Sequence, residues 1–213
     1  QAPITIAVLI FSVVIHEVSH GVTAEKLGDP TARRLGRITL NPIPHLDILG
    51  SIIIPAIATF TGAPLIGWAK PVPVQPVRFD RKFSMRTGMA LTSIAGPLSN
   101  FLMAMVCIVA FRFLLPGRPL STSMGEPGAL ASLQYLLTVM IYLNMGLMIF
   151  NLLPLPPLDG SRLLPRRFDS LQDRIRPFSY LILMGMVFFL GGIIFAPVWI
   201  FIRVVSMILG IPV

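Results

Sequence analysis

Cysteine and charged residues are scarce in this sequence of 213 residues. A single cysteine, Cys107, excludes an internal disulfide framework and a metal site built from several cysteines. Charged residues make up only 12%, against the roughly 25% typical of a soluble domain. Disorder is excluded as well, because 54% of the residues are hydrophobic and the mean hydropathy is +0.81. The composition therefore indicates an integral membrane protein.

The charged residues that are present lie between apolar segments, and most of them are basic. Lys and Arg total 17 against 9 Asp and Glu, a formal net charge of +8. The basic segments 25–37, 70–86 and 154–177 are predicted to face the cytoplasm, where loops collect Lys and Arg, and segment 116–127 is placed outside. Nucleic-acid binding would need the charges on one polar face. No nucleic-acid partner is therefore expected.

Apolar stretches between these loops predict the membrane-spanning helices. The first, about Pro3–Lys26, runs inward; the second, Met85–Leu115, returns outward; and the third, Gly128–Leu153, comes back in. The C-terminal stretch Phe178–Val213 is long enough for one tilted helix and a second, shorter element. Pro197 and the mid-stretch Arg203 weaken the prediction of that second element, because a charge in lipid is costly.

The apolar stretch Leu46–Trp68 is expected to enter the membrane and return on the same side. Basic loops flank it at both ends, and glycines and prolines interrupt it, which opposes a straight crossing helix. The neighbouring segments Arg37–Leu40 and Pro71–Val74 have extended patterns. The predicted fold class is an all-α polytopic membrane protein with about five to six transmembrane helices, a small membrane-associated β element and this re-entrant segment.

The first predicted helix contains ionisable residues at lipid depth. His16 and His20 are four positions apart, so both imidazoles leave one face of the helix, a spacing that lets two nitrogens bind one Zn²⁺. Glu17 lies beside that face, where it can take a proton from a zinc-activated water. The alternative is a pair of core histidines with backbone or hydroxyl partners. The high free-energy cost of burying these groups in an apolar run favours the metal site.

A catalytic zinc site commonly has three protein ligands, so a third must come from another segment. One candidate source is the pair His45 and Asp47. The other is Asp159, within Asn151–Gly160, where prolines block regular helix and the final glycine permits a tight turn. Such a turn can bring the aspartate back to the first helix, or it can leave the aspartate solvated. Residue chemistry alone leaves these alternatives open.

Three motifs resemble those of the site-2 protease family of intramembrane zinc metalloproteases. They are His-Glu-x-x-His at His16–His20, Gly-Pro-Leu-Ser-Asn at Gly96–Asn100, and Asn-x-x-Pro-x-Pro-x-Leu-Asp-Gly at Asn151–Gly160, in the family's order. The resemblance extends over about residues 4–162. It implies a small bacterial-type member without a PDZ domain, because the external loop at 116–127 is short.

The resemblance implies a zinc metalloendopeptidase and assigns its central residues. His16, His20 and Asp159 would hold one zinc ion per chain, and Glu17 would be the general base. One membrane domain, 1–213, would contain a catalytic core at 3–162, then a linker and further membrane helices at 163–213. The expected partners are the lipid bilayer and the transmembrane segment of a protein substrate. The expected location is a bacterial cytoplasmic membrane, with the active site toward the cytoplasm.

Four other polar residues have predicted roles. Asn100 and Asn151 are expected to help hold substrate or the oxyanion. His45 is expected to orient a ligand or to stand at the cytoplasmic mouth near bound substrate, with a hydrogen-bonded turn as the alternative. Asn144 is expected to form an interhelical hydrogen bond, with a place on the substrate path as the alternative.

A transmembrane substrate poses a separate problem, because its helix already satisfies its own backbone hydrogen bonds. Cleavage therefore requires local unwinding, and the unwound segment needs new hydrogen-bond partners. An extended segment of this chain, near Leu40 or Val74, is expected to supply them by adding the substrate as a strand.

Three other functions are weighed against the protease. A zinc-dependent membrane hydrolase acting on a non-peptide substrate would use the same metal site. A metal-ion transporter would need ionisable residues at several depths, whereas here they cluster at one site. An inactive scaffold is disfavoured by the complete set of His16, Glu17, His20 and Asp159.

Overall fold

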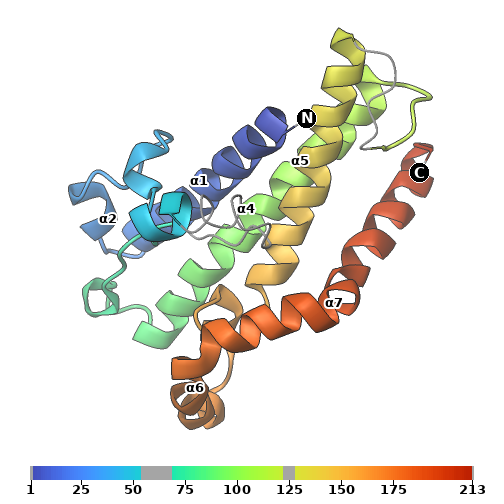
Figure 1. Cartoon of the computed structure of the whole chain (residues 1–213). Coiled ribbons are helices and arrows are strands. Elements are labelled where there is room, and N and C mark those ends of the chain that lie inside the picture. The colour runs from blue at the N-terminus through green and yellow to red at the C-terminus, as the bar shows by residue number, and fades with distance from the viewer. Residues whose placement is uncertain (1, 54–68, 122–127, 213) are drawn as a thin grey trace.

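The computed structural model describes residues 2–53, 69–121 and 128–212. Within them, four helices are long and apolar enough to cross a membrane (Figure 1): α1 (Ala2–Lys26), α4 (Met85–Leu114), α5 (Ala129–Asn151) and α7 (Ser179–Leu209). The first three confirm the three clear predicted spans to within two residues at each end. The chain is therefore a mostly helical, polytopic membrane protein.

The C-terminal stretch forms one helix, not the predicted helix followed by a shorter element. α7 continues through Pro197 to Leu209, and Figure 1 shows that it changes direction along its course. A proline inside a helix removes one hydrogen bond and produces a bend, which packing against a neighbouring helix can hold. Val198 and Ile202, just after the proline, are buried against the rest of the bundle. These contacts hold the part of α7 that follows Pro197 against the bundle.

Short helical elements connect the long helices. Between α1 and α4 they are α2 (Thr31–Arg34), η1 (Ile43–His45), η2 (Ile48–Ile53) and η3 (Pro76–Arg78); between α5 and α7 they are η4 (Asp159–Leu163), η5 (Arg166–Phe168), α6 (Asp169–Ile175) and η6 (Arg176–Phe178). The predicted re-entrant segment Leu46–Trp68 begins with the π-helix η2, and its remainder lies outside the described residues. The prediction of five to six spans thus exceeds the four that the described residues supply.

The predicted β element is not found among the residues that the structure describes. Arg37–Leu40 and Pro71–Val74 are not assigned as strands. The first segment contacts the second through a side chain: the Arg37 guanidinium donates a hydrogen bond to the carbonyl oxygen of Lys70 at 2.7 Å. Pro71 and the proline two residues later have no N–H, so this segment cannot donate the regular series of backbone hydrogen bonds that a ladder needs.

One buried carboxylate ties together the two loops that follow α1 and precede α4. Asp29 is fully buried, and its oxygens accept hydrogen bonds from the backbone N–H of Thr31 at 3.0 Å and of Gln75 at 2.6 Å. Hydrogen bonds to a buried carboxylate are stronger than those between neutral groups. This contact fixes the segment 70–75 beside the end of α1, where it borders the polar site.

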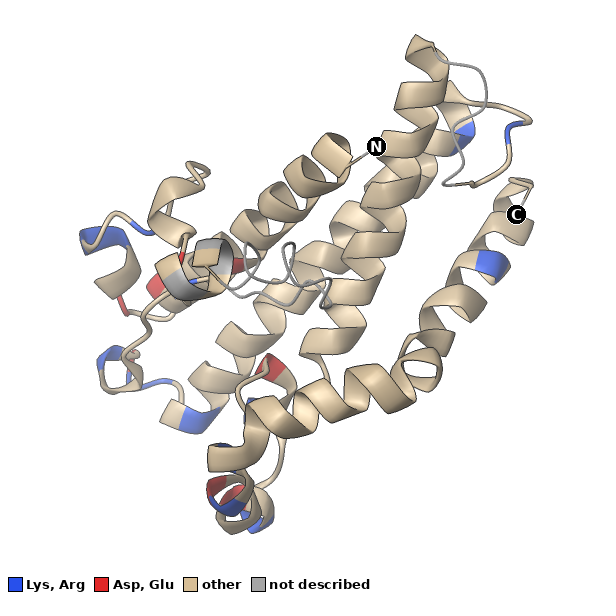
Figure 2. Ribbon diagram, in the orientation of Figure 1, with Lys and Arg blue, Asp and Glu red and all other residues tan. Residues whose placement is uncertain are grey.

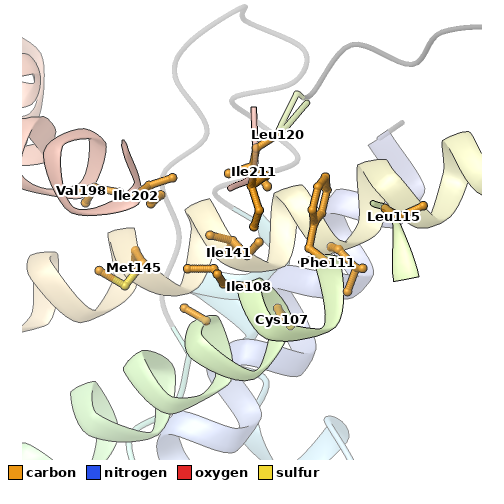
Figure 3. Packing of buried hydrophobic residues seen from close by; sticks show 12 residues of the cluster. Cys107, Ile108, Phe111, Leu115, Leu120, Ile141, Met145, Val198, Ile202 and Ile211 are labelled. Atoms are coloured by element: carbon orange, nitrogen blue, oxygen red, sulfur yellow. The ribbon is translucent and has the colours of Figure 1, made fainter. Parts of the chain in front are cut away.

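The main apolar core joins α4, α5 and α7. Figure 3 shows Ile108 and Phe111 of α4, Ile141 of α5 and Ile202 of α7, all fully buried, among the other residues of the cluster. Much of the remaining apolar surface of the four helices is exposed, as it must be for a bundle surrounded by lipid. The core therefore packs α4, α5 and α7 together, while the polar site lies on α1, α4 and the turn after α5.

Basic residues gather at one end of the bundle (Figure 2). They lie near the end of α1, the start of α4 and around α6. Arg112 lies in the last turn of α4, and Arg118 follows in the connection between α4 and α5, at the other end of α4 from the basic start of that helix. The relative sides that the charge pattern predicts for these loops thus match the way the helices run (Figure 1).

The chain turns back on itself directly after α5. Gly160 lies so close to the end of α5 that a Cβ atom there would be 2.2 Å from the carbonyl oxygen of Leu152 and 2.5 Å from that of Leu153. Only a glycine tolerates backbone at this distance. The turn places Asp159 beside the helices, and its neighbours Leu155 and Leu158 are buried against Leu183 of α7.

Replacement of Gly160 by Ala is expected to destabilise the protein. The added methyl group meets rigid backbone, so the turn must shift, with a loss of about 1–3 kcal/mol in the free energy of unfolding. Gly185→Ala is the matched control, because a Cβ at Gly185 meets no atom within 4 Å. Thermal unfolding in detergent measures both. Equal melting temperatures for the two variants would contradict this account of the turn.

Candidate metal centre

Two imidazoles face one another on the buried side of α1. His16 and His20, one helical turn apart, have exposed fractions of 6% and 8%. Their ring centroids are 4.7 Å apart and their planes are nearly perpendicular, at 87°. The i, i+4 spacing on a continuous helix accounts for this arrangement. The sequence prediction that both side chains leave one face of the helix is confirmed.

Asp159 is the third member of the cluster. Its Oδ2 lies 3.1 Å from Nε2 of His16 and 3.2 Å from Nε2 of His20. Ligand atoms around a tetrahedral zinc, with bonds of about 2.0–2.1 Å, lie about 3.3 Å apart, so these separations match the edges of such a site. Within the described ranges, these three residues form the one group of ligand side chains close enough to hold a metal ion.

The outer nitrogens of both rings face carbonyl-type oxygens. Nδ1 of His16 lies 2.6 Å from Oδ1 of Asn100, and Nδ1 of His20 lies 2.7 Å from the backbone carbonyl oxygen of Thr92. An oxygen of either kind only accepts, so each Nδ1 carries the proton. In the neutral rings, both Nε2 atoms then present a lone pair toward Asp159, which is the tautomer that a metal ligand requires.

Asp159 is an anion at neutral pH. Burial by itself would raise the pKa of its carboxyl group, but without a cation between them a proton on Nε2 of His16 or His20 would hydrogen-bond to it, and these contacts lower the pKa to about 2. Two nitrogen lone pairs and a carboxylate oxygen at about 3 Å repel one another unless positive charge lies among them. A divalent cation supplies that charge, and the two-imidazole, one-carboxylate donor set is one that Zn²⁺ accepts. The residues present therefore fit the predicted metal.

A second carboxylate stands beside the cluster. Glu17 accepts a hydrogen bond from the backbone N–H of Val72 at 2.8 Å through Oε2. With His16, His20 and Asp159 it lines a cavity of about 120 Å³, whose other walls come from segment 71–74, α4 and the turn after α5. The cavity gives a small polar reactant access to the three ligand atoms and to the Glu17 carboxylate.

A glycine on α4 leaves the space that both histidine rings occupy. A Cβ atom at Gly96 would lie 2.5 Å from Nε2 of His16 and 2.5 Å from Nε2 of His20. Any larger side chain would fill the space that the two ring nitrogens face. The glycine of the Gly96–Asn100 motif thus has a direct steric role at the site.

The remaining predicted site residues occupy different places. Asn151 lines the cavity, and its Nδ2 donates to the carbonyl oxygen of Leu147 at 3.0 Å. Asn100 does not line the cavity; it is fully buried behind His16, a place that favours holding the ring over contact with substrate. His45 lies in η1 with its Nε2 at 3.0 Å from the carbonyl oxygen of Thr39, which favours the hydrogen-bonded turn.

Of the candidates for the third metal ligand, the structure favours Asp159 over His45 and Asp47. Asp47 accepts a hydrogen bond from the backbone N–H of Gly50 at 2.8 Å, so it caps η2, and neither Asp47 nor His45 belongs to the metal-ligand group. Asp159 is the member that the turn after α5 brings to the histidines.

Two residues that line the cavity were not identified from the sequence. Ser93 of α4 is buried, and its hydroxyl has no hydrogen-bond partner among the described residues. Arg162 follows the Asp159 turn and is exposed at the cavity. Ser93 precedes Gly96 by three positions and so lies on the same helix face, a signal that helical spacing could have supplied.

Replacement of Gly96 by Ala is expected to weaken zinc binding by at least tenfold, by the order of effect seen when ligand orientation is disturbed. The reason is that the new methyl group would displace both ring nitrogens. Competition with a chromogenic chelator measures the affinity. Gly146→Ala on α5 is the control, because its Cβ would meet the nearest atom at an ordinary 3.7 Å. Wild-type zinc affinity in Gly96→Ala would contradict the proximity of this residue to the site.

Comparison with known proteins agrees with this site. Residues 4–193 match the family model described as Peptidase family M50. A Bacillus subtilis (strain 168) protein named "Putative zinc metalloprotease YwhC" is 41% identical over 164 residues, which cover 76% of this chain and 68% of the relative.

Mycobacterial relatives are more distant. Proteins named "Putative zinc metalloprotease Rip2" from Mycobacterium tuberculosis (Erdman) and Mycolicibacterium smegmatis are each 28% identical, over 172 and 174 residues. The matches cover 81% and 82% of this chain but only 57% and 58% of the relatives, so the chain spans little more than half of their length. No solved structure matches the chain. The family match contains every residue of the metal cluster, and the chain belongs to peptidase family M50, the site-2 protease family of zinc metalloproteases.

Proposed function

We propose that the chain is an intramembrane zinc metalloprotease that hydrolyses a peptide bond within or near the transmembrane segment of a membrane protein. The observation that carries this proposal is the meeting of His16, His20 and Asp159 beside the carboxylate of Glu17 in one cavity of a helical membrane bundle. Among the described spans, His16 and His20 are the buried imidazoles, and no buried Asp, Glu, Lys or Arg accompanies them there, which supports a single reaction site and disfavours a transport pathway.

We propose that His16, His20 and Asp159 hold one zinc ion per chain. A zinc ion held there supplies Lewis acidity, which makes water a stronger nucleophile at neutral pH and polarises a carbonyl group. The protein's part is to keep both imidazoles neutral at Nε2 and the carboxylate ionised, which the partners of the two Nδ1 atoms and the burial of the cluster support.

We assign the general base to Glu17. Its carboxylate borders the cavity but is not one of the ligand atoms, so it is free to accept a proton from the attacking water and deliver it to the leaving nitrogen. The hydrogen bond from the N–H of Val72 holds one carboxylate oxygen and leaves the other to the reacting groups.

We also propose that the segment 70–74 binds the unwound substrate. Pro71, Val72 and Val74 line the cavity, so a peptide lying along this segment would place a scissile bond beside the metal ligands. The two prolines keep the segment from pairing into a sheet within the chain, and it can instead offer its remaining N–H and C=O groups to an incoming strand. Asn151 lines the same cavity and would contact the same peptide.

The location and the division of the chain follow from the charge pattern and the site. Basic loops at the end of the bundle nearest the cavity support a cytoplasmic active site in a bacterial cytoplasmic membrane. All residues of the cluster and the cavity fall within the proposed catalytic core, 3–162, of a single membrane domain, while residues 163–213 provide the linker and the helix α7.

The general-base assignment predicts that Glu17→Gln loses cleavage but keeps zinc. Removing a general base lowers the rate about 10²–10⁴-fold. The measurement is cleavage of a single-span substrate in liposomes, with metal content determined on the same samples. Glu25→Gln is the control, because Glu25 lies on the same helix but pairs with Arg33.

Two results would distinguish a wrong general-base assignment from a wrong metalloprotease proposal. Wild-type cleavage by Glu17→Gln would remove Glu17 from the mechanism. Cleavage by the wild type that survives complete removal of zinc by a chelator would instead reject the metalloprotease.

The docking proposal predicts that Val74→Pro slows cleavage about tenfold, the effect of losing roughly one hydrogen bond to the transition state, at unchanged zinc affinity. The substitution removes the backbone N–H of Val74. Val74→Ala keeps that N–H while losing the packing of Val74 against Ala24, Leu27 and Phe79, so it controls for stability. Equal rates for the two variants would reject this segment as the docking edge.

A further inference from the structure

A chain of buried amides crosses the three helices behind the metal centre. Asn100 of α4 and Asn144 of α5 are fully buried, as is Ser12 of α1. The Asn100 amide donates to Oδ1 of Asn144 at 2.7 Å, and the Asn144 amide donates to Oγ of Ser12 at 2.9 Å. At its other end, Oδ1 of Asn100 faces Nδ1 of His16 at 2.6 Å. From this geometry we propose that Asn144 is a positioning residue, which fixes the proton of His16 on Nδ1 by acting through Asn100.

The orientation of the amides in this hydrogen-bonded series is set at the end far from His16. Nδ2 of Asn144 lies 2.8 Å from the backbone carbonyl oxygen of Met140. A carbonyl oxygen only accepts, so the NH₂ side of the Asn144 amide must face it. Oδ1 of Asn144 is then turned toward Asn100. A backbone carbonyl of α5 thus decides which way the first amide points.

The orientation of Asn144 in turn determines that of Asn100, and through Asn100 the tautomer of His16. The NH₂ group of Asn100 donates to Oδ1 of Asn144 at 2.7 Å and, at 3.4 Å, to the backbone carbonyl oxygen of Ser12, so its Oδ1 is left to face His16. That oxygen accepts a hydrogen bond from Nδ1–H, and Nε2 of the neutral ring keeps its lone pair for the metal. If either amide flipped, an NH₂ group would face Nδ1, the proton would move to Nε2, and the ligand atom would be blocked.

The orientation of the His20 ring does not depend on these amides. Nδ1 of His20 lies against a backbone carbonyl, that of Thr92, at 2.7 Å. A backbone acceptor on a helix cannot flip, so His20 needs no relay. The inference therefore concerns one ligand of the two, and it rests on the proposed zinc site.

The proposal is tested by the zinc affinity of three variants, measured by chelator competition on the full chain in detergent. Asn144→Leu removes both the acceptor for Asn100 and the donor to Met140, and we expect zinc affinity to fall about 10–100-fold, as for other partners of metal-bound histidines. Asn144→Asp keeps the acceptor toward Asn100, so its affinity is expected to stay within about threefold of wild type. Thr138→Val is the control: Thr138 is fully buried on α5, and its hydroxyl has no partner among the described residues.

Comparison of the two Asn144 variants distinguishes a positioning role of Asn144 from a role in protein stability alone. A purely structural Asn144 predicts that a buried carboxyl is at least as damaging as leucine, whereas the relay predicts tighter zinc binding in Asn144→Asp than in Asn144→Leu. The absorption spectrum of the Co²⁺-substituted protein gives a second readout, which should change in Asn144→Leu and not in Thr138→Val. If Asn144→Leu does not fold, Asn144→Ala removes the same amide without added bulk.

Equal affinities in Asn144→Leu and wild type, or equal losses in Asn144→Leu and Asn144→Asp, would overturn the relay. A wild-type protein that binds zinc but cleaves nothing would reject the proposed protease and leave the relay standing. A wild-type protein that binds no zinc would reject both.

Discussion

The convergence of one carboxylate on two imidazoles, inside a helical bundle that lipid surrounds, is the constraint on which the rest of the structure depends. Lone pairs and negative charge at about 3 Å repel strongly where water is scarce, so the cluster requires a cation and a complete shell of partners. The shell is present: Asn100 and Thr92 hold the outer nitrogens, and the turn at Gly160 holds Asp159. Two of these partners come from α4 and the third from the turn after α5, so the site exists only when α1, α4 and that turn are all in place.

The glycines at the site leave space for other groups, whereas the buried amides add polar contacts between the helices. At Gly96 and Gly160 the chain omits a side chain, because ligand rings or backbone occupy the space that a Cβ would need. At Asn100 and Asn144 it places polar groups inside a largely apolar bundle, and each amide has a hydrogen-bond partner in a neighbouring helix. Buried polar networks of this kind specify one relative position of the helices, since a shift leaves an unsatisfied amide. The apolar cluster of α4, α5 and α7 stabilises the bundle without that specificity.

Membership of peptidase family M50 and the geometry of the site support the same chemistry from independent directions. The family match covers residues 4–193, whereas the cavity is defined by side chains from four separate segments of the fold. The hydrogen bond between Val72 and Glu17 connects the proposed general base to the proposed substrate-binding segment. If both proposals hold, this one backbone N–H would couple substrate docking to proton transfer.

The sequence alone determined the helices and the two-histidine face, because hydrophobic runs and the i, i+4 spacing are local properties. It also supplied Asp159 as a candidate through the proline-rich motif. Residue chemistry alone left His45 and Asp47 as alternatives, the family resemblance favoured Asp159, and the turn after α5 brings Asp159 within 3.2 Å of both rings. Only the tertiary structure placed Asn100 behind His16, joined it to Asn144, and carried α7 through Pro197, since each depends on contacts between helices distant in the chain. Chain-local patterns fix which residues can be ligands; the packing of helices decides which of them meet, because metal geometry is set by distances in space that no spacing in sequence encodes.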